Sequence, residues 1–591
     1  MHLCRAQILN FRNFRALDVA LGANAVIVGE NRVGKSNFVF ALRLVLDPTL
    51  PDSARQLKLS DIWDGHDPTI DPQISVHVDF AEFEDDPALT ALLTDYRLAE
   101  NHHVARLTYQ FRKKAEIVGR PQTESDFEFK VFGGGDETRQ VKTDVRRRIC
   151  LDVLQALRDA EGELASWRSS PLRPLLDDAI ARIPQQEVTA VATDMSAVTA
   201  RMAALPPIQD LETSLRERIA VMAGSTQDIH AKLGFAPTDP LRLFRSIRVF
   251  IDEGKRSLSE ASLGSANLAL LALKLAEFDW RRLKNERDHT IVCVEEPEAH
   301  LHPHLQRSVF QKLLREADRA RSLFLTTHSP NIASVAPLAS VVLLKSELDI
   351  GTRAYSLAKL NLKEEEREDL QRYLDVTRAE IFFSRAAVFV EGEAEVALLP
   401  AFARSIGIDL DELGITVCSV AGVNFSPYVK LAAALRLPFS VITDWDPRPP
   451  ARALGLNRSR GLIQDIRIAS SRQPPSAQES AALEGNEEAL RQAAIADGIY
   501  MNNDTFELEI ARTNGLVDAL LTVIEGEDFG RIRRQRIVAW KADPSTIDAA
   551  QLLSIVADIG KGRLAGRLAA EAIGLPPPAY IRAALEHVAH G

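Results

Sequence analysis

Carboxylates gather at two points in the C-terminal half of the chain, each directly after a run of apolar residues. Glu391 and Glu395 lie in AAVFVEGEAEV, and Asp444 and Asp446 lie in FSVITDWD. Like charges this close repel one another unless a cation lies among them, and no matching basic cluster accompanies them in the sequence. Oxygen ligands select hard ions such as Mg²⁺, Mn²⁺ or Ca²⁺. The four carboxylates therefore predict a metal site, with exposed acidic loops as the alternative.

The spacing of these carboxylates suggests hydrolysis of a phosphodiester. Two divalent ions about 4 Å apart can brace the attacking and leaving oxygens of such a displacement. Period-two alternation along an extended chain puts Asp444 and Asp446 on the same side, roughly 7 Å apart. Glu395 falls in the first turn of a predicted helix, where it can converge with Glu391. Whether Glu393 points away from both depends on where that helix starts.

A second kind of chemistry is indicated near the N-terminus, where residues 29–36 read GENRVGKS and fit the phosphate-loop pattern G-x4-G-K-[ST]. The loop follows the apolar strand AVIV and precedes the helical run NFVFALRLVL, which is the context the motif requires. Backbone N–H groups and the helix N-terminus surround phosphates there. The nucleotide contacts predicted from the loop are Asn31, Gly34, Lys35 for the terminal phosphates and Ser36 for Mg²⁺.

Two further strand ends complete this nucleotide site. The apolar strand TIVCV runs into Glu295 and Glu296. One carboxylate at such a position can hold the metal shell through water, and the next can polarise the attacking water as a general base. We assign Glu295 to the metal and Glu296 to the water. His328 ends the strand FLTT, where it is either a γ-phosphate contact or a structural histidine.

The elements that must position these residues are strands alternating with helices, which predicts an α/β protein. A chain of 591 residues is too long to fold around a single hydrophobic core, so about two to four domains are expected. Residues 144–235 look helical, either as an arm for self-association or as a packed insertion, and a charged helix follows near 363–376. The net charge of −11 excludes wholesale polyanion binding, so DNA contacts require local basic runs such as 146–148 or 531–536. Scattered cysteines and the lack of a long apolar run or signal-peptide core predict a cytoplasmic, non-membrane protein.

The first half of the chain resembles a known ATPase class. LCRAQILNFRNF, the phosphate loop, EEPEAHLHP and TTHSP look like the ABC-type ATPase heads of the SMC and RecF kind. The resemblance implies a signature segment that caps the partner subunit's ATP, matched here by Ser262 and Gly264 in ASLGS, although the segment keeps only one central glycine. Gln73 is the candidate for the family's Q-loop. The family places His300, His302 and His304 in a loop after the glutamates, so zinc is not expected there.

The second half resembles the Toprim domain of topoisomerases, primases and related nucleases, which carries a strand-end glutamate and a later Asp-x-Asp. An ABC-type head followed by Toprim is the layout of the OLD (overcoming lysogenization defect) nucleases, the family that includes the Gabija nuclease subunit. The resemblance implies that Glu391, Glu395, Asp444 and Asp446 are metal ligands. It adds two residues from sequence context: Glu507 in TFE as a ligand, with Glu509 as its rival, and Lys561 near the scissile phosphate, with Arg563 as its rival.

The predicted architecture is an α/β chain with a P-loop ATPase domain interrupted by a helical insertion and followed by a parallel-sheet Toprim domain. The expected boundaries are 1–143 and 239–350 for the ATPase, 144–238 for the insertion, 351–384 for a linker and 385–591 for Toprim. The expected function is an ATP-using, two-metal DNA endonuclease; a structural DNA-binding clamp with a non-cleaving Toprim domain is the alternative. The resemblance, closest to the second OLD class, also implies a homodimer and a UvrD-like helicase partner.

Overall fold

The computed structural model divides into two compact units, which are described separately. The first comprises residues 1–154, 289–298 and 302–591, and the second residues 155–288 and 299–301. The structure describes residues 1–66, 72–121, 123–154, 170–223, 232, 233, 247, 249–251, 256, 257, 262–315, 321–449 and 451–590.

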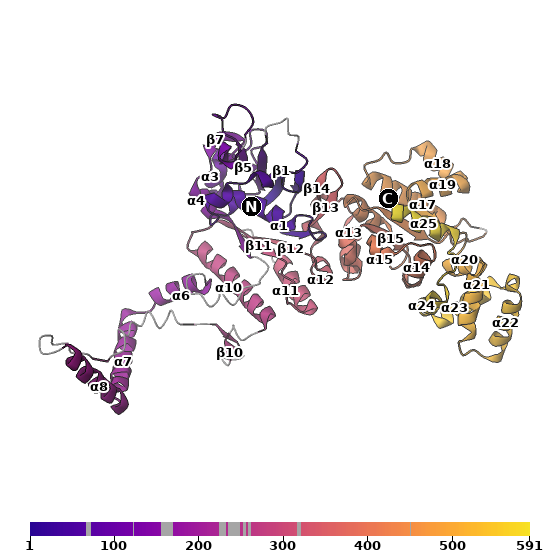
Figure 1. Cartoon of the computed structure of the whole chain (residues 1–591). Helices are drawn as coiled ribbons and strands as arrows, with labels where there is room; N and C mark the ends of the chain where they lie inside the picture. The colour runs from indigo at the N-terminus through magenta and orange to yellow at the C-terminus, as the bar shows by residue number, and fades with distance from the viewer. Residues whose placement is uncertain are drawn as a thin grey trace. The chain divides into compact units, whose positions relative to one another are not determined.

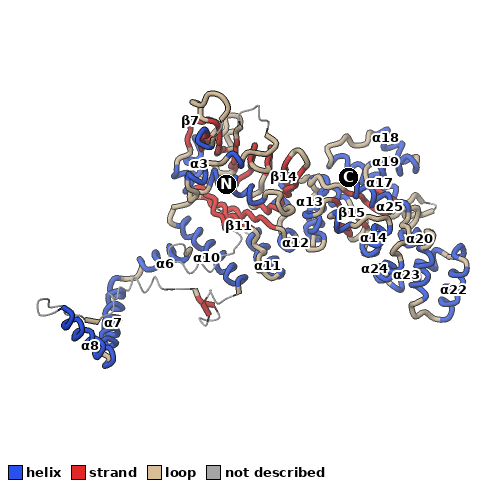
Figure 2. Tube along the Cα trace, viewed as in Figure 1, coloured by secondary structure: helices blue, strands red, loops and turns tan. Residues whose placement is uncertain are grey.

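A 12-stranded mixed sheet forms the ATPase part of the first unit (Figures 1 and 2). Its order is β7-β6-β5-β4-β1-β2-β14-β13-β3-β12-β11-β8. The strands are β1 (His2–Phe11), β2 (Phe14–Ala20), β3 (Ala25–Val28), β4 (Ile74–Ala81), β5 (Ala105–Lys113), β6 (Phe127–Gly133), β7 (Asp136–Gln140), β8 (Ile149–Leu154), β11 (His289–Glu295), β12 (Arg321–Thr327), β13 (Val341–Glu347) and β14 (Gly351–Ser356).

The predicted nucleotide-site residues follow strands in the parallel part of this sheet. In that part the neighbouring strands are β13, β3, β12, β11 and β8. These strands have mostly buried, largely apolar centres, and all four residues of β3 are buried. Parallel strands end at one edge, so the phosphate loop after β3, the glutamates after β11 and His328 after β12 are brought together. The predicted helix after the loop is α1 (Lys35–Leu46), which packs against β4 and β8.

One predicted element is wrong. The helical texture expected from residue 144 includes Ile149–Leu154, but these residues form β8, which pairs with β11 in parallel register. The reason is their composition, because ICLDVL is rich in β-branched and apolar residues that fit a buried sheet edge as well as a helix face. The rest of the helix expected in this run, over 155–167, lies outside the described residues.

The Toprim part of the first unit is a four-stranded parallel sheet with the order β16-β15-β17-β18. Its strands are β15 (Ala386–Val390), β16 (Ile415–Ser419), β17 (Phe439–Thr443) and β18 (Ile499–Met501). The charged helix α13 (Glu364–Tyr373) precedes it as expected. The helices around the site are α14 (Glu393–Ser405), α17 (Leu454–Ala469), α20 (Phe506–Arg512) and α24 (Lys561–Glu571). The basic run 531–536 opens α22 (Arg531–Ala542).

The second unit is mainly helical (Figure 2). It contains α6 (Leu172–Ala181), α7 (Gln185–Ala203), α8 (Pro206–Ala223) and α10 (Leu263–Leu283), with the short hairpin β9 (Phe250–Ile251) and β10 (Arg256–Ser257). Neither α6 nor α7 buries a residue. Among the described residues, no helix is both long enough and apolar enough to cross a membrane.

Candidate active sites

The phosphate loop is shaped by a side chain that sequence reasoning missed. Gly34 has a φ of 97°, and a Cβ there would collide with the amide of Asn13. Asn13 donates to the Val33 carbonyl at 2.7 Å and accepts from Asn37 at 2.7 Å. Asn13 lies in the β1–β2 turn, so the N-terminal hairpin braces the loop. The only sequence feature that pointed to Asn13 was its position in the NFRNF stretch, next to a predicted strand.

Lys35 connects the loop to the other predicted nucleotide residues. Its Nζ donates to the carbonyls of Gly29 and Glu30, both at 2.9 Å, and lies 3.2 Å from His328 Nδ1. His328 Nε2 is in turn 3.3 Å from Glu296 Oε1. Burial lowers the pKa of Lys35 to about 8, against the raising effect of nearby glutamates. This chain of contacts supports His328 as part of the nucleotide site rather than an isolated structural residue.

The strand-end glutamates occupy distinct surroundings. Burial raises the pKa of Glu295 at the end of β11. Glu296 has a φ of 44°, and its N–H donates to the Thr326 carbonyl at 2.9 Å. Glu298, which sequence reasoning did not select, accepts the His328 N–H at 2.7 Å, and its buried Oε2 has no protein partner. Asn31 and Ser36 are exposed on the loop. A cation-binding role for these carboxylates stays a prediction.

The signature candidate lies in the second unit. Ser262 caps α10 by accepting the Ser265 N–H at 3.3 Å, and a Cβ at Gly264 would lie 2.5 Å from the His300 carbonyl oxygen. The glycine therefore permits close backbone packing within that unit. Gln73 precedes β4 and donates to Ser75 at 3.2 Å. The rings of His302 and His304 stack with centroids 5.4 Å apart.

In the Toprim part, the C-terminal ends of three parallel strands carry polar residues at one edge. Glu391 follows β15, Asp444 follows β17 and Asn502 follows β18. Glu395 is buried in the first turn of α14, whereas Glu393 begins that helix with an exposed side chain. Sequence reasoning missed Asn502, although a polar residue directly after an apolar strand was the same signal that selected Asp444.

Arg458 is an unforeseen cation among the predicted ligands. From α17 its Nη1 donates to Glu391 Oε1 at 2.7 Å, and its Nη2 donates to Asp446 Oδ2 at 2.9 Å. The sequence shows no basic cluster beside these carboxylates, but the fold places this single arginine between two of them. Arg458 lies 12 residues after Asp446 in an ordinary helical sequence, and only the packing of α17 brings its side chain to the strand ends.

The expected alternation of Asp444 and Asp446 is also wrong. The strand β17 ends at Thr443, and Asp446 has a φ of 50°, so the two aspartates do not lie on an extended chain. The chain turns because the Asp446 N–H donates to the Asp504 carbonyl at 3.1 Å and its carbonyl accepts the Leu454 N–H at 3.2 Å. The turn aims Asp446 at Arg458.

Burial raises the pKa of two carboxyl groups at this edge, those of Asp444 and Glu395. Burial raises the pKa of Asp444 to about 8, with the charge of Glu391 adding to the effect and a hydrogen bond from Asn502 opposing it. That bond joins Asn502 Nδ2 to Asp444 Oδ1 at 2.5 Å. Burial likewise raises the pKa of Glu395 to about 7. Carboxyls perturbed in this way are common at functional sites.

Glu507 and Lys561 lie together, whereas their rivals have other partners. Lys561 Nζ is 2.9 Å from Glu507 Oε1, and the buried Oε2 of Glu507 has no protein partner. Burial lowers the pKa of Lys561, but Glu507 and the other carboxylates outweigh it and leave the pKa raised. Glu509 accepts the Asn503 N–H at 3.0 Å, and Arg563 lies 3.4 Å from Glu527. The geometry favours Glu507 and Lys561 for the roles that the resemblance implies.

The donor chemistry of this edge fits a hard cation, because all five predicted ligands offer carboxylate oxygen and Glu507 Oε2 is an unsatisfied buried acceptor. Within the described residues, no three acidic, histidine or cysteine side chains are close enough to hold one ion. Ion pairs with Arg458 and Lys561 engage three of the carboxylates instead: Glu391, Asp446 and Glu507. Holding a metal therefore requires these side chains to move.

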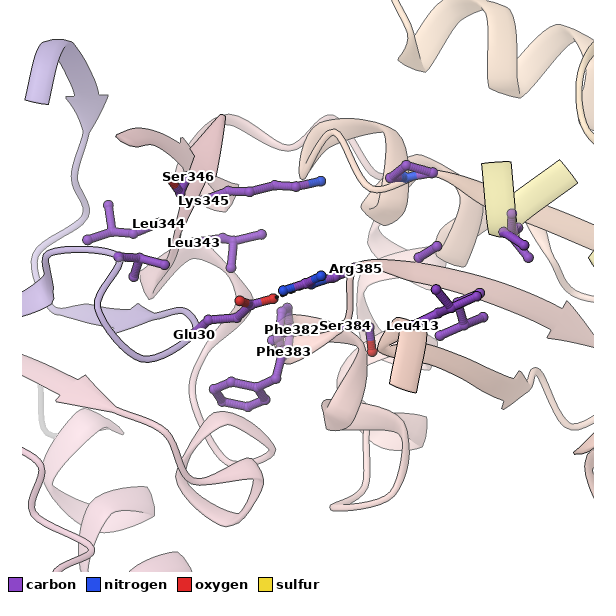
Figure 3. A pocket seen from close by; sticks show the side chains of 16 residues that line it. Glu30, Leu343, Leu344, Lys345, Ser346, Phe382, Phe383, Ser384, Arg385 and Leu413 are labelled. Atoms are coloured by element: carbon purple, nitrogen blue, oxygen red, sulfur yellow. Dashed lines mark hydrogen bonds and ion pairs between the residues drawn. The ribbon is translucent and has the colours of Figure 1, made fainter. Parts of the chain in front are cut away.

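The phosphate loop and the Toprim sheet meet at a cavity of about 480 Å³ (Figure 3). Glu30 of the loop points across it at Arg385, the residue before β15, and Arg385 Nε donates to Glu30 Oε1 at 3.2 Å. Lys345 on β13 donates to the Arg436 carbonyl at 3.2 Å. Side chains of Phe382 and Leu343 line the same cavity.

Two family models match this chain. Residues 25–334, more than half of the chain, match "AAA domain, putative AbiEii toxin, Type IV TA system". Residues 382–446 match "Overcoming lysogenization defect protein-like, TOPRIM domain". The C-terminal region of the Burkholderia pseudomallei OLD protein is 35% identical; the match covers 98% of that chain and 35% of this one, with a TM-score of 0.32. The chain belongs to the OLD family.

Two relatives that match over most of their own length agree with this placement in the OLD family. The OLD nuclease of Thermus scotoductus is 26% identical over 76% of this chain and 82% of the relative. The endonuclease GajA of Bacillus cereus is 21% identical over 78% of this chain and 79% of the relative. This OLD-family chain is an ATPase-linked nuclease, with the ATPase in its large mixed sheet and the nuclease in its Toprim sheet.

Proposed function

We propose that this OLD-family protein is a divalent-metal-dependent endonuclease that cleaves duplex DNA in its Toprim domain and uses ATP in its head. The observation that carries the proposal is the convergence of acidic side chains from separate elements on one sheet edge, next to a lysine and an arginine. The same convergence disfavours a non-cleaving clamp, which needs no such site. The proposed ligands are Glu391, Glu395, Asp444, Asp446 and Glu507.

The charge of the site supports a two-ion mechanism. Five carboxylates against Arg458 and Lys561 leave three negative charges when all are ionised, and two divalent ions with one phosphodiester bring the total to neutrality. Mg²⁺, or Mn²⁺ or Ca²⁺ in its place, supplies Lewis-acid stabilisation of the reacting oxygens when bound. Lys561 contributes its ammonium to the charge that develops on the phosphate.

The head has a separate set of roles. Asn31, Gly34 and Lys35 bind the phosphates of ATP, while Ser36 and Glu295 hold its Mg²⁺. Glu296 acts on the attacking water, and its contact with His328 at 3.3 Å orients the carboxylate. The signature residues Ser262 and Gly264 complete the ATP site of a partner copy.

The proposed homodimer has a candidate surface on α7. Val191, Met195, Val198 and Met202 on α7, followed by Leu205 two residues after its end, repeat with alternating spacings of four and three, which is the pattern of a coiled-coil seam. Val198 is 52% exposed and Met202 is 47% exposed, so a packed insertion does not account for them. A seam of this kind fits the helical-arm alternative. A UvrD-like helicase partner and a cytoplasmic location also stay predictions.

Incubation of supercoiled plasmid with Mg²⁺ or Mn²⁺ tests the nuclease function. Wild type is expected to nick or linearise the plasmid, and Asp444→Asn to leave it intact because a proposed metal ligand is lost. Asp528→Asn is the matched control, since the Asp528 side chain is 96% exposed on the surface. An uncut plasmid with wild type under every metal, with and without ATP, contradicts the nuclease proposal.

Light scattering coupled to size-exclusion chromatography tests the dimer. Met202→Glu should shift the protein towards the monomer, because it places a charge in the seam. Ala200→Glu lies on the opposite side of the same helix and should leave the mass unchanged. A wild-type mass of one chain at micromolar concentration excludes the proposed dimer.

A further inference from the structure

We infer that Arg458 is an internal counterion that competes with divalent metal for Glu391 and Asp446. The inference rests on the proposed nuclease function and deepens it, because it names the residue that controls entry of metal into that site. In this role Arg458 is a positioning residue, acting on the ligands rather than on DNA.

The contacts of Arg458 are those of a cation between two ligands. One guanidinium nitrogen reaches Glu391 at 2.7 Å and the other reaches Asp446 at 2.9 Å. The first nitrogen also donates to Thr443 Oγ1 at 2.6 Å and to the Asp444 carbonyl at 3.1 Å. The planar fork of arginine suits such a bridge, which ties the end of β15 to the end of β17.

These bonds occupy one of the two carboxylate oxygens of Glu391, Oε1. Oε1 accepts from Arg458, from Thr443 Oγ1 at 2.6 Å and from the Asp444 N–H at 2.9 Å. Three donors leave no lone pair on that oxygen for coordination. The Arg458 side chain is only 10% exposed, so its charge is poorly screened by water. A metal ion that coordinates Glu391 Oε1 or Asp446 Oδ2 therefore has to displace the guanidinium.

The other three proposed ligands have carboxylates that Arg458 does not contact, since it reaches Asp444 only at the backbone carbonyl. Glu395 and Asp444 lie deeper, and Glu507 pairs with Lys561. Binding of the first ion to this group leaves the arginine bridge intact, whereas a second ion has to displace it. The two ions are therefore expected to bind with unequal affinity, and Arg458 sets the metal concentration at which the second one enters.

Measurement of Mn²⁺ binding to the full-length protein tests the competition directly. Free Mn²⁺ is quantified by its electron paramagnetic resonance signal, and melting temperatures are recorded in EDTA and in saturating Mn²⁺. The second, more weakly bound Mn²⁺ ion should bind about tenfold more tightly to Arg458→Ala than to wild type. The reason is that a buried positive charge next to two proposed ligands is removed. Arg458→Ala should melt lower than wild type in EDTA and recover most of that loss in Mn²⁺.

The matched control lies on the same helix. Arg467 on α17 bridges Asp497 at 2.9 Å and Glu479 at 2.8 Å, with a side chain that is 18% exposed. Arg467→Ala should lower the melting temperature equally in EDTA and in Mn²⁺ and leave Mn²⁺ affinity unchanged, as a purely structural arginine would.

A second variant, Arg458→Lys, tests the competition if Arg458→Ala folds poorly. Arg458→Lys keeps the positive charge but loses the planar guanidinium that bridges two carboxylates. Its affinity for the second Mn²⁺ ion should therefore stay within about threefold of the wild-type value. If wild type binds Mn²⁺ and Arg458→Ala behaves like Arg467→Ala, the competition is overturned while the nuclease proposal stands. If wild type binds no Mn²⁺, both are overturned.

Discussion

Removal of the Asn502 amide should weaken both the Toprim fold and its hold on metal. The side chain is 1% exposed and makes two hydrogen bonds, donating to Asp444 Oδ1 at 2.5 Å and accepting the Trp445 N–H at 2.8 Å. Asn502→Ala breaks both bonds and leaves two buried polar atoms without a partner. At about 1 kcal/mol for each net bond, plus desolvation, we expect a loss of about 3 kcal/mol in unfolding free energy.

The same change acts on metal binding through Asp444. The bond from Asn502 lowers the pKa of Asp444, so its loss raises that pKa further above the present value of about 8. A proton then competes more strongly with metal at neutral pH, and each unit of added shift weakens binding about tenfold. Mn²⁺ affinity at pH 7 should fall accordingly, and raising the pH to 9 should restore most of it.

Urea unfolding in EDTA, followed by tryptophan fluorescence, measures the first effect, and a Mn²⁺ titration measures the second. The neighbouring Asn503 is the control, because its side chain is exposed while its backbone N–H makes the bond to Glu509. Asn503→Ala should therefore match wild type in both assays. Equal urea midpoints for the Asn502 and Asn503 variants would refute the reasoning that this amide supports the site.

Three further outcomes are expected. Lys35→Ala should abolish ATP hydrolysis but leave Mn²⁺ binding unchanged; an ATPase rate equal to wild type contradicts the phosphate-loop assignment. Because burial lowers the pKa of Lys35 from 10.5 to about 8, the free protein loses this proton above pH 8. Bound phosphates should restore it, so calorimetry in two buffers at pH 9 should show uptake of about one proton per ATP. Lys561→Ala should slow plasmid cleavage by about 100-fold, whereas Arg563→Ala should not, and the reverse order would exchange their roles.

The phosphate loop and the strand ends could be predicted because each depends on local sequence. A glycine-rich loop between an apolar strand and a helix has few alternative structures, and parallel strands deliver their final residues to one edge. Glu391 and Asp444 lie at such ends in the structure. Glu507 and Lys561 required the family resemblance, since α20 and α24 approach the sheet only through tertiary packing.

The residues that sequence reasoning missed act across long separations. Arg458 reaches Glu391 over 67 positions, and Asn502 reaches Asp444 over 58. No periodicity encodes such a pair, because it depends on how α17 and β18 pack beside β17. The turn at Asp446 escaped prediction for a related reason, since its positive φ is fixed by bonds to Asp504 and Leu454. The strand β8 was misread because short apolar runs suit either secondary structure.

The strand β15 carries Arg385 immediately before it and Glu391 immediately after it, with parallel neighbours bonded on both sides. One end faces Glu30 of the phosphate loop and the other faces Arg458, across about 20 Å of extended chain. An insertion of one residue would turn one of these two charged side chains to the opposite face of the sheet. The length of this five-residue strand therefore sets how Arg385 and Glu391 face relative to each other.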